Sequence, residues 1–469
     1  MIRTSEEYDD GAGGDNGISS LNDGNNRPWY RRRWVQIGAG ITALILVIVA
    51  ISVPTAKVQQ AKAGANAEVE GPLVPPPQVP PQVLQSNKDD FGNTLLTYYK
   101  TYGIDWENMQ EAGTPQNLAL EWVAGSANYD RLDRAQRVQR YVLAVFYYST
   151  FKQANYYYNT QNGSTERVQG WTSALNWMSQ ERECDWEGVT CEGDAVTGIL
   201  LREHRLTGAM PLELAFMSTS LQTLDFTSNF LYLDGDAEKT PLTHLERVNT
   251  LLMEDNYVVC SMGLPASIGE MTSLKKLVLS YNILQGPLDG DIFANLQELT
   301  HLEVESNFLN GELPQELLDL KNLVYVYIRS NYLDLILPTV LANGTLPSLF
   351  AMWLDSNNVV GPIPPTIASK SDLASLSITN TTLGGSIPPE MGRLGGLRRV
   401  WLYENDLTGR IPNELAQLPL LEVLEVFENK LTGTMPSGVC STIQNAAYDF
   451  KALSADCGEV SCDCCTECY

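Results

Sequence analysis

From about residue 196 onward, apolar residues alternate with polar ones in short stretches that return at a nearly constant interval. One unit reads Leu-Glu-Val-Glu-Ser-Asn307-Phe-Leu-Asn-Gly-Glu-Leu-Pro, and a later one reads Leu-Glu-Val-Phe-Glu-Asn429-Lys-Leu-Thr-Gly-Thr-Met-Pro. The same polar position recurs every 24 to 27 residues, which indicates an array of similar units. It falls at His204, Asn229, Asn256, Asn282, Asn307, Asn331, Asn357, Thr381, Asn405 and Asn429.

The alternation within each unit predicts a short strand with one face turned inward, because successive side chains of a strand point to opposite faces. A single short strand cannot bury its apolar face, so neighbouring units must stack on each other. We therefore predict an α/β solenoid of ten repeats over residues 196–440. The recurrent Asn carries a donor and an acceptor, which suits it to backbone groups buried at the bend after the strand. His204 and Thr381 should satisfy those groups less well.

Residues 131–150, RLDRAQRVQRYVLAVFYYST, predict a helix because their apolar residues have helical spacing. We assign residues 91–195 to a helical N-terminal cap, since the first repeat of a solenoid exposes its core unless another element covers it. Residues 441–469 are assigned to a Cys-rich C-terminal cap for the same reason. The residues at helical spacing are Leu132, Ala135, Val138, Tyr141, Val142, Val145 and Phe146.

The run of about twenty uncharged residues at 34–53 is long enough to cross a bilayer as a helix. Four arginines between residues 27 and 33 favour a cytosolic N-terminus and an extracellular location for everything after the run. A signal-anchor is predicted, and a cleaved signal peptide is the competing interpretation. We interpret residues 1–33 as a disordered tail and the Pro-rich residues 54–90 as a semi-rigid stalk. The sequons, which are predicted glycosylation sites, all follow the run, at Asn162, Asn343 and Asn380.

The nine cysteines fall into two groups and one remainder. Cys184 and Cys191 lie seven residues apart, and six more crowd the last thirty residues. Such a cluster indicates disulfides outside the cell and zinc in the cytosol, so the predicted topology favours disulfides, with their connectivity left open. Cys260 is then expected to be a buried free thiol. The six C-terminal residues are Cys440, Cys457, Cys462, Cys464, Cys465 and Cys468.

The chain is strongly acidic, with a formal net charge of −25, and residues 91–469 carry 23 Lys and Arg against 46 Asp and Glu. Such a surface repels a phosphate backbone, which excludes nucleic acid as a partner and favours a cationic or neutral one. The three histidines are scattered, and the sequence shows no nucleophile–base pair or phosphate loop in a supporting context. We therefore expect neither catalysis nor a cofactor nor a bound metal.

The second half of several units resembles the plant-type subclass of the leucine-rich repeat family. Gly-Pro-Ile-Pro stands at 361–364, Gly-Ser-Ile-Pro at 385–388 and Gly-Arg-Ile-Pro at 409–412. This resemblance, which covers roughly residues 170–440, implies a right-handed solenoid. Three repeats depart from the pattern, because Leu233, Cys260 and Leu335 stand where Gly is usual.

The segment before the repeats, Trp-Thr-Ser-Ala-Leu-Asn-Trp at 171–177 and Cys184-Asp-Trp-Glu-Gly-Val-Thr-Cys191, resembles the N-terminal cap of receptor-like members of this family. The resemblance implies a disulfide between Cys184 and Cys191. It also implies a receptor-like membrane protein that signals through a membrane co-receptor, since the predicted cytosolic tail is too short for a kinase. With its Cys-Cys-Thr-Glu-Cys ending, the membrane-anchored chain further resembles leucine-rich repeat proteins of diatom-type algae.

Between the inward leucines of the later repeats, aromatic residues alternate with carboxylates on the predicted concave strand face. Such a rigid surface suits a peptide, a cationic protein patch or a sugar ring, although the rings could instead only pack laterally against each other. Of the Arg-x-Arg pair that clamps a peptide carboxylate in receptor-like relatives, the strip contains only Arg329. The candidate ligand-binding residues are Tyr325, Tyr327, Trp353, Asp355, Trp401, Tyr403, Glu404 and Phe427, with Glu425 and Glu428 in the same strip.

The sequence therefore predicts a membrane-anchored extracellular protein that recognises a peptide, protein or glycan ligand. Two alternatives from other functional classes stay open. One is a structural or adhesion protein of the cell surface, and the other is an inhibitor of secreted hydrolases.

Overall fold

The computed structural model of the chain describes residues 78–151, 155–159, 164–168, 171–237, 239–446 and 451–469. The chain divides into one unit of Met1–Glu68 with Tyr158–Thr165 and a second of Val69–Tyr157 with Glu166–Tyr469. Nearly all of the first unit lies outside the described residues, as do the predicted tail, the predicted membrane segment at 34–53 and most of the predicted stalk. Among the described residues, no helix combines the length and apolar character that a bilayer crossing requires.

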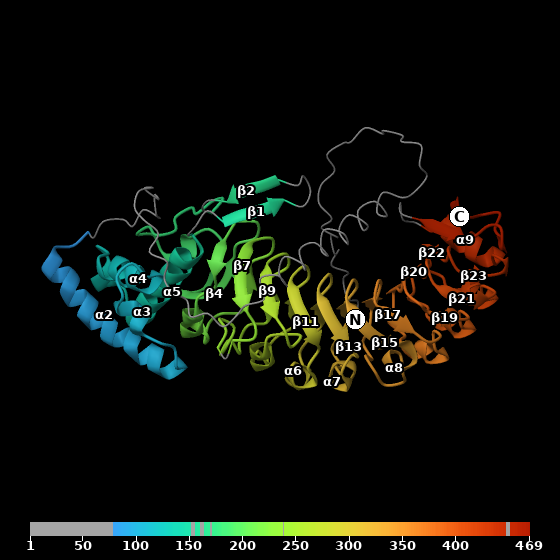
Figure 1. Cartoon of the computed structure of the whole chain (residues 1–469), viewed down its shortest axis with the longest axis horizontal. Helices are drawn as coiled ribbons and strands as arrows, with labels where there is room; N and C mark the ends of the chain where they lie inside the picture. Colours follow the sequence, from blue (N-terminus) through green and yellow to red (C-terminus); the bar gives the residue numbers. More distant parts are fainter. Residues whose placement is uncertain (1–77, 152–154, 160–163, 169–170, 238, 447–450) are drawn as a thin grey trace, which may run out of the picture. The chain divides into compact units, whose positions relative to one another are not determined.

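Within the described part of the second unit, four α-helices precede the repeats (Figure 1). They are α2 (Pro81–Tyr102), α3 (Glu107–Gln110), α4 (Pro115–Ala124) and α5 (Arg134–Thr150). The helix predicted within 131–150 is α5, and it begins at a capping box in which Asp133 and Gln136 each accept a hydrogen bond from the other's backbone N–H. Its fully buried Tyr141, Val142 and Phe146 place it in the same hydrophobic core as the first repeats.

The helix α2 corrects the predicted boundary between stalk and cap. It begins at Pro81, so residues 81–90 are helical and do not belong to an extended stalk. Proline is well tolerated at the first position of a helix, where no intrahelical N–H bond is lost. Phe91, Leu95 and Tyr99 recur every four residues and are fully buried, which fixes the helix onto the cap. The helical segment that precedes the repeats therefore begins at Pro81.

Each repeat contributes one short strand to a 13-stranded sheet, in which all neighbouring pairs are parallel except β3 and β4. In chain order the strands are β3 (Val189–Glu192), β4 (Ala195–Leu200), β6 (Thr223–Asp225), β8 (Thr250–Leu252), β10 (Lys276–Val278), β12 (His301–Glu303), β14 (Tyr325–Tyr327), β16 (Ala351–Trp353), β18 (Ser375–Ser377), β20 (Arg399–Trp401), β22 (Val423–Glu425), β25 (Ala452–Ala455) and β27 (Glu467–Cys468).

A second row of strands follows the bend of each repeat. Seven of them form one parallel sheet: β5 (Thr207–Ala209), β7 (Phe230–Asp234), β9 (Tyr257–Cys260), β11 (Ile283–Pro287), β13 (Phe308–Gly311), β15 (Tyr332–Ile336) and β17 (Asn358–Val360). Smaller sheets are β19 (Gly384–Gly385), β21 (Asp406–Gly409) and β23 (Lys430–Leu431), then β24 (Gly433–Thr434) with β26 (Val460–Ser461), and β1 (Asn155–Asn159) with β2 (Ser164–Val168).

Short helices return the chain from the second row to the next strand of the 13-stranded sheet. In Figure 1, α6 (Gly290–Asn295), α7 (Gln315–Leu318) and α8 (Leu337–Val340) follow one another along one edge of the repeats. Five other repeats use 3₁₀ turns here, no helix or 3₁₀ turn is assigned in the described residues between β7 and β8, and α9 (Ser437–Asn445) covers the last repeat. The 3₁₀ turns are η3 (Leu212–Met217), η4 (Ala266–Glu270), η5 (Pro365–Ser369), η6 (Pro389–Arg393) and η7 (Asn413–Gln417), while η1 (Tyr129–Arg131) and η2 (Glu183–Asp185) lie in the cap.

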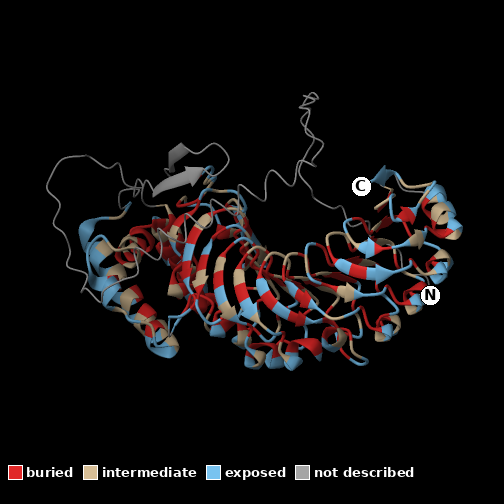
Figure 2. Cartoon of the chain, turned by 45° about the vertical axis from the view of Figure 1, so that its right-hand side comes forward, coloured by how far each residue is buried: buried red, intermediate tan, exposed pale blue. Residues whose placement is uncertain are grey.

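The core lies between the two rows of strands and the short helices. The middle residue of each repeat strand points inward, and Leu277, Leu302 and Leu376 are fully buried. Figure 2 shows the resulting bands of buried and exposed positions along the strands. Stacking thus buries an apolar face that no single repeat could bury alone, as predicted.

The predicted Asn ladder is present, and Asn307 shows its geometry. Its Nδ2 donates to the carbonyls of Leu279, Val304 and Glu305 at 2.9–3.2 Å, and its Oδ1 accepts from the backbone N–H of Leu284 at 3.1 Å. One amide therefore bridges two consecutive repeats and satisfies four buried backbone groups. The same link from Nδ2 to a carbonyl of the preceding repeat is made by Asn229, Asn256, Asn282, Asn331, Asn357, Asn405 and Asn429.

The two departures from Asn make fewer links, as expected. The Thr381 hydroxyl donates to Oδ1 of Asn405 and accepts from the N–H of Leu383 at 3.2 Å. A hydroxyl has one hydrogen where an amide has two, so it cannot serve several carbonyls. His204 contacts the Arg202 carbonyl with Nδ1 at 2.6 Å, and its Nε2 lies 3.5 Å from Glu187.

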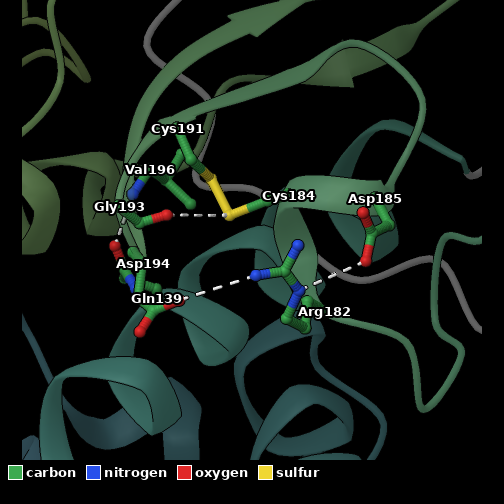
Figure 3. The surroundings of a disulfide bond; sticks show 8 residues. All are labelled: Gln139, Arg182, Cys184, Asp185, Cys191, Gly193, Asp194 and Val196. Atoms are coloured by element: carbon green, nitrogen blue, oxygen red, sulfur yellow. Dashed lines mark hydrogen bonds and ion pairs between the residues drawn. A yellow bond between two sulfur atoms is a disulfide. The ribbon is translucent and has the colours of Figure 1, made fainter.

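The segment around the Cys184–Cys191 disulfide is fastened to α5 (Figure 3). Gln139 of α5 donates to the Asp194 carbonyl and accepts from the N–H of Val196. Arg140, which is 1% exposed, forms an ion pair with Glu183 inside the cap. These links position the first repeat strand on the helix that covers it.

The C-terminal cap continues the sheet instead of only covering it. Its strands β25 and β27 extend the 13-stranded sheet beyond the last Asn repeat. Asp456 accepts hydrogen bonds from the N–H groups of Glu428 and Asn429 at 2.8 and 3.1 Å, at the final bend. The five cysteines of this segment and the preceding Cys440 form three disulfides, Cys440–Cys464, Cys457–Cys468 and Cys462–Cys465, and Cys260 is a buried free thiol. None of these six sulfurs is a free thiolate for zinc.

Candidate functional site

The register of the 13-stranded sheet brings the predicted aromatic residues into columns across neighbouring strands. Glu303, Tyr327, Trp353, Ser377 and Trp401 are paired in succession from β12 to β20. A parallel column runs through His301, Tyr325, Ala351, Ser375 and Arg399. A third position lies two residues after the first column and holds Glu305, Arg329, Asp355, Thr379, Tyr403 and Phe427 in successive repeats.

The rings in the first two columns form one continuous group, which we call the Trp353 cluster: His301, Tyr325, Tyr327, Trp353 and Trp401. His301 stacks on Tyr325 at 4.3 Å between ring centroids, and Tyr327 stacks on Trp353 at 4.4 Å. The two stacks meet edge to face, with 6.1 Å between the tyrosine rings. The two tryptophans meet edge to face at 6.5 Å, across a strand whose outward residues are serines.

The ring of Trp353 is held in place from two sides. Its Nε1 donates to the hydroxyl of Ser375 at 3.1 Å. The guanidinium carbon of Arg329 lies 5.0 Å from the ring centroid, within cation–π range. Trp353 and Trp401 are both half-buried, so each keeps part of an ordered aromatic surface accessible.

Charged groups beside the cluster are unusually buried. Glu305 is 7% exposed, and its Oε2 lies 2.9 Å from Nε of Arg329. Burial raises the pKa of Glu305 to about 7, although the adjacent Arg329 opposes this shift. Burial likewise raises the pKa of Asp355, whose carboxylate accepts from Ser377 and Thr379. Asp355 therefore supports the strand face from within and presents little surface to a ligand.

A second aromatic group lies near the C-terminal end of the sheet. Tyr403, Phe427 and Tyr469 stack in succession, with centroids 4.6 and 3.8 Å apart. The stack leaves Phe427 only 3% exposed, so this predicted ligand residue acts mainly in packing. Burial and the neighbouring Glu467 raise the pKa of Glu425 to about 6.

The eight predicted ligand residues thus divide by accessibility. Tyr325, Tyr327, Trp353, Trp401, Tyr403 and Glu404 are half-buried on the sheet face, whereas Asp355 and Phe427 are buried. The lateral stacking that formed the alternative interpretation is present throughout, and it coexists with partly accessible rings. His301, Glu305 and Tyr469 were missed by the sequence reasoning. His301 and Glu305 could have been found by counting one repeat back from Tyr325 and Arg329.

The described sequons lie where a glycan could be attached. Asn343 and Asn380 are both exposed. Asn162 lies outside the described residues. Lys370, which is 1% exposed, holds the loop of Asn343 by donating to the Ala342 carbonyl at 2.9 Å.

Comparison with known proteins finds similarity to plant receptor-like proteins and receptor ectodomains. Receptor-like protein 39 of Arabidopsis thaliana is 34% identical over 115 residues, which is 24% of this chain and 13% of that protein. A TDR receptor structure is 29% identical, with a TM-score of 0.50, over 56% of this chain and 43% of that one. The ectodomain of the Arabidopsis receptor kinase HAESA, in complex with an extended IDA peptide hormone, is 25% identical with a TM-score of 0.50.

The HAESA match covers 60% of this chain and 50% of that one, so the chain spans half or less of each of these three relatives. No protein-family model matches the chain. The repeats of this chain form a fold of stacked parallel strands and carry the Asn ladder and the Gly-x-Ile-Pro segments quoted above. In sequence and fold the chain is similar to plant receptor-like proteins and to leucine-rich repeat receptor ectodomains.

Proposed function

We propose that the chain is a membrane-anchored, receptor-like recognition protein whose repeat domain lies outside the cell and binds a peptide or protein at the Trp353 cluster. The observation that carries the proposal is the pair of half-buried tryptophans, Trp353 and Trp401, held at 6.5 Å on a rigid parallel sheet. Preorganised aromatic rings supply contact area at a low cost in conformational entropy, which is why they concentrate binding energy in protein interfaces.

The electrostatics of the domain favour a cationic ligand segment. Residues 91–469 carry twice as many acidic as basic residues. Long-range attraction would raise the rate of encounter with a basic or neutral partner. Arg329 is already paired with Glu305, so we do not assign it to the carboxylate of a ligand.

The comparisons support a peptide or protein ligand over a glycan. One of the two receptor structures of matching fold contains a peptide hormone, and Receptor-like protein 39 is named for its likeness to receptors. The uncharged run at 34–53 is long enough to cross a bilayer, which supports an anchored protein.

The proposal is tested by capture. The repeat domain with its caps, residues 78–469, is produced as a secreted protein and incubated with the peptides and proteins of the host's own extracellular medium. Retention of a discrete, saturable ligand supports recognition. Retention of abundant wall or matrix polymers without saturation would instead support the adhesion alternative, and loss of a secreted hydrolase activity would support the inhibitor alternative.

A further inference from the structure

The seven-stranded sheet of the second row has an outward face that is separate from the 13-stranded sheet of the Trp353 cluster. Figure 1 shows its strands β11, β13, β15 and β17 following one another along the middle repeats. The residue directly after each ladder position points outward and the next one points inward, as the exposed Tyr332 and the fully buried Leu333 show. A side chain one residue after the ladder position therefore lies on this outward face.

This outward position is apolar in one part of the array and polar in another. In five consecutive repeats it holds Phe230, Tyr257, Ile283, Phe308 and Tyr332. In the next four repeats it holds Asn358, Thr382, Asp406 and Lys430. Second-row strands also form in the repeats with a polar residue here, so the fold does not require a large apolar one.

The apolar side chains of the middle repeats are exposed and lie next to one another. Tyr332 is 60% exposed, Ile336 44% and Val360 38%. Ile336 and Val360 are opposite each other on β15 and β17, and Phe308 stacks on Tyr332 with 6.4 Å between the ring centroids. We call these four residues the Tyr332 face. Adjacent exposed apolar side chains are typical of interaction surfaces, whereas single ones are not.

The charge around the Tyr332 face has one sign. The seven strands contain no Lys, Arg or His. Asp234 and Asp334 lie in the strands, Glu312 directly follows β13, and all three are exposed. None of these carboxylates forms an ion pair with another described residue. In the next sheet, by contrast, Lys430 pairs with Asp406 at 2.6 Å.

This combination of apolar surface and negative charge selects among possible occupants. A second copy of this acidic domain would bring like charges together, which opposes self-association. Anionic lipid head groups are repelled for the same reason. A polypeptide that carries Lys or Arg beside apolar side chains matches both features, because its cations compensate the carboxylates while its apolar groups cover the exposed rings.

We propose that the Tyr332 face binds a cationic amphipathic segment of another protein, with Lys or Arg side chains at Glu312 and Asp334 and apolar side chains over Tyr332. This partner is independent of the ligand at the Trp353 cluster, because the two surfaces belong to different sheets. None of the three sequons lies in the seven strands, so no predicted glycan is attached to this face.

Photo-crosslinking of the full-length protein in nonionic detergent tests both features with three synthetic peptides. Each peptide has a central benzoylphenylalanine, and its flanking residues alternate Lys with Leu, Lys with Ser, or Glu with Leu. We expect the peptide of Lys and Leu to crosslink to β13, β15 and β17 at least about tenfold more than the other two, because it alone matches charge and apolar surface. Equal yields on these strands for all three peptides, or crosslinks of the first peptide confined to other parts of the chain, would overturn the proposal.

Matched variants locate the contact. Phe308→Thr with Tyr332→Thr introduces the residue type found at this position two repeats after Tyr332, so the fold tolerates it, and it should lower the crosslinking yield about tenfold. Glu312→Gln with Asp334→Asn should also lower the yield, whereas Leu420→Thr, at an exposed leucine outside this sheet, should leave it unchanged.

Two results of these variants would contradict the proposal. One is a folded double threonine variant that crosslinks as the parent does. The other is self-association of the parent chain that the double threonine variant abolishes, which would identify a second copy as the occupant of the Tyr332 face.

Discussion

Arg329 connects Glu305 to Trp353: its Nε lies 2.9 Å from Oε2 of Glu305, and its guanidinium carbon lies 5.0 Å from the indole centroid of Trp353. The carboxylate directs the guanidinium, and the guanidinium in turn covers one part of the indole. The orientation of the Trp353 ring on the sheet face therefore depends on the ion pair that Arg329 forms with the buried Glu305.

Glu305 should make the stability of the repeat domain depend on pH. Its pKa is raised to about 7 in the folded state, so the folded protein retains a proton that the unfolded chain loses above about pH 4.5. Stability should then fall as pH rises from about 4.5 to 7 and level off above. Glu305→Gln removes this cost. The unfolding free energy of the variant minus that of the parent should therefore increase by up to about 3 kcal/mol when the pH is raised from 5 to 8.

Urea unfolding at the two pH values measures this difference. Glu312→Gln, which removes an exposed carboxylate of the same repeat, controls for the loss of one negative charge. If Glu305→Gln changed stability equally at both pH values, the assigned role of the buried carboxyl would be wrong.

The buried pair of Arg140 and Glu183 should be essential to the N-terminal cap. Arg140 is 1% exposed and also lies near the rings of Trp122 and Trp186. Arg140→Met leaves Glu183 as an uncompensated buried charge and should cost about 3–5 kcal/mol of unfolding free energy. The double variant Arg140→Met/Glu183→Gln should recover much of that loss. A double variant as unstable as the single one would show that packing of the arginine, and not its charge, matters.

Thr381 offers a direct test of the ladder. Thr381→Asn supplies the second amide hydrogen and should stabilise the repeat domain by about 1 kcal/mol, since buried carbonyls gain a donor. The reciprocal change Asn307→Thr removes three donated hydrogen bonds and should destabilise by about 1–3 kcal/mol. The thermal midpoints of the two variants provide the comparison. If both midpoints rose or both fell, the amide hydrogen bonds would not be what stabilises the ladder.

The exposed sequons test the predicted orientation. Glycosidase treatment of the chain from its native host should lower its apparent mass, and Asn343→Gln with Asn380→Gln should reduce that change. Protease added to intact cells should remove the repeat domain. Complete protection, together with an unchanged mass, would place the repeats on the other side of the membrane.

Much of the repeat architecture follows from the sequence because its determinants are local and periodic. Alternating leucines and a polar residue every 24 to 27 positions define both the strand and its bend, and the structure places these positions in register. The start of α2 was not predictable in this way. Pro80 and Pro81 are typical of an extended segment. The helix that begins there is stabilised by the tertiary burial of Phe91, Leu95 and Tyr99, which the local sequence does not reveal.

The candidate site was predicted as a set of residues but not as a set of roles. Asp355 and Trp353 lie two residues apart on the same predicted face, yet the first is buried by Ser377 and Thr379 while the second stays partly accessible. Tyr469 covers Phe427 from a distant C-terminal segment that no repeat period specifies. Burial across strands depends on which large side chains are neighbours, and a single repeat does not contain that information.

The central claim is that the Trp353 cluster binds the ligand, and capture by single variants of the 78–469 domain tests it most directly. Trp353→Ala and Trp401→Ala should each lower retention of the captured ligand by about tenfold or more, with the thermal midpoint nearly unchanged. Tyr232→Ala, on the separate seven-stranded sheet and 46% exposed, is the matched control and should retain the ligand. Undiminished capture by both folded tryptophan variants, or an equal loss in Tyr232→Ala, would contradict the account.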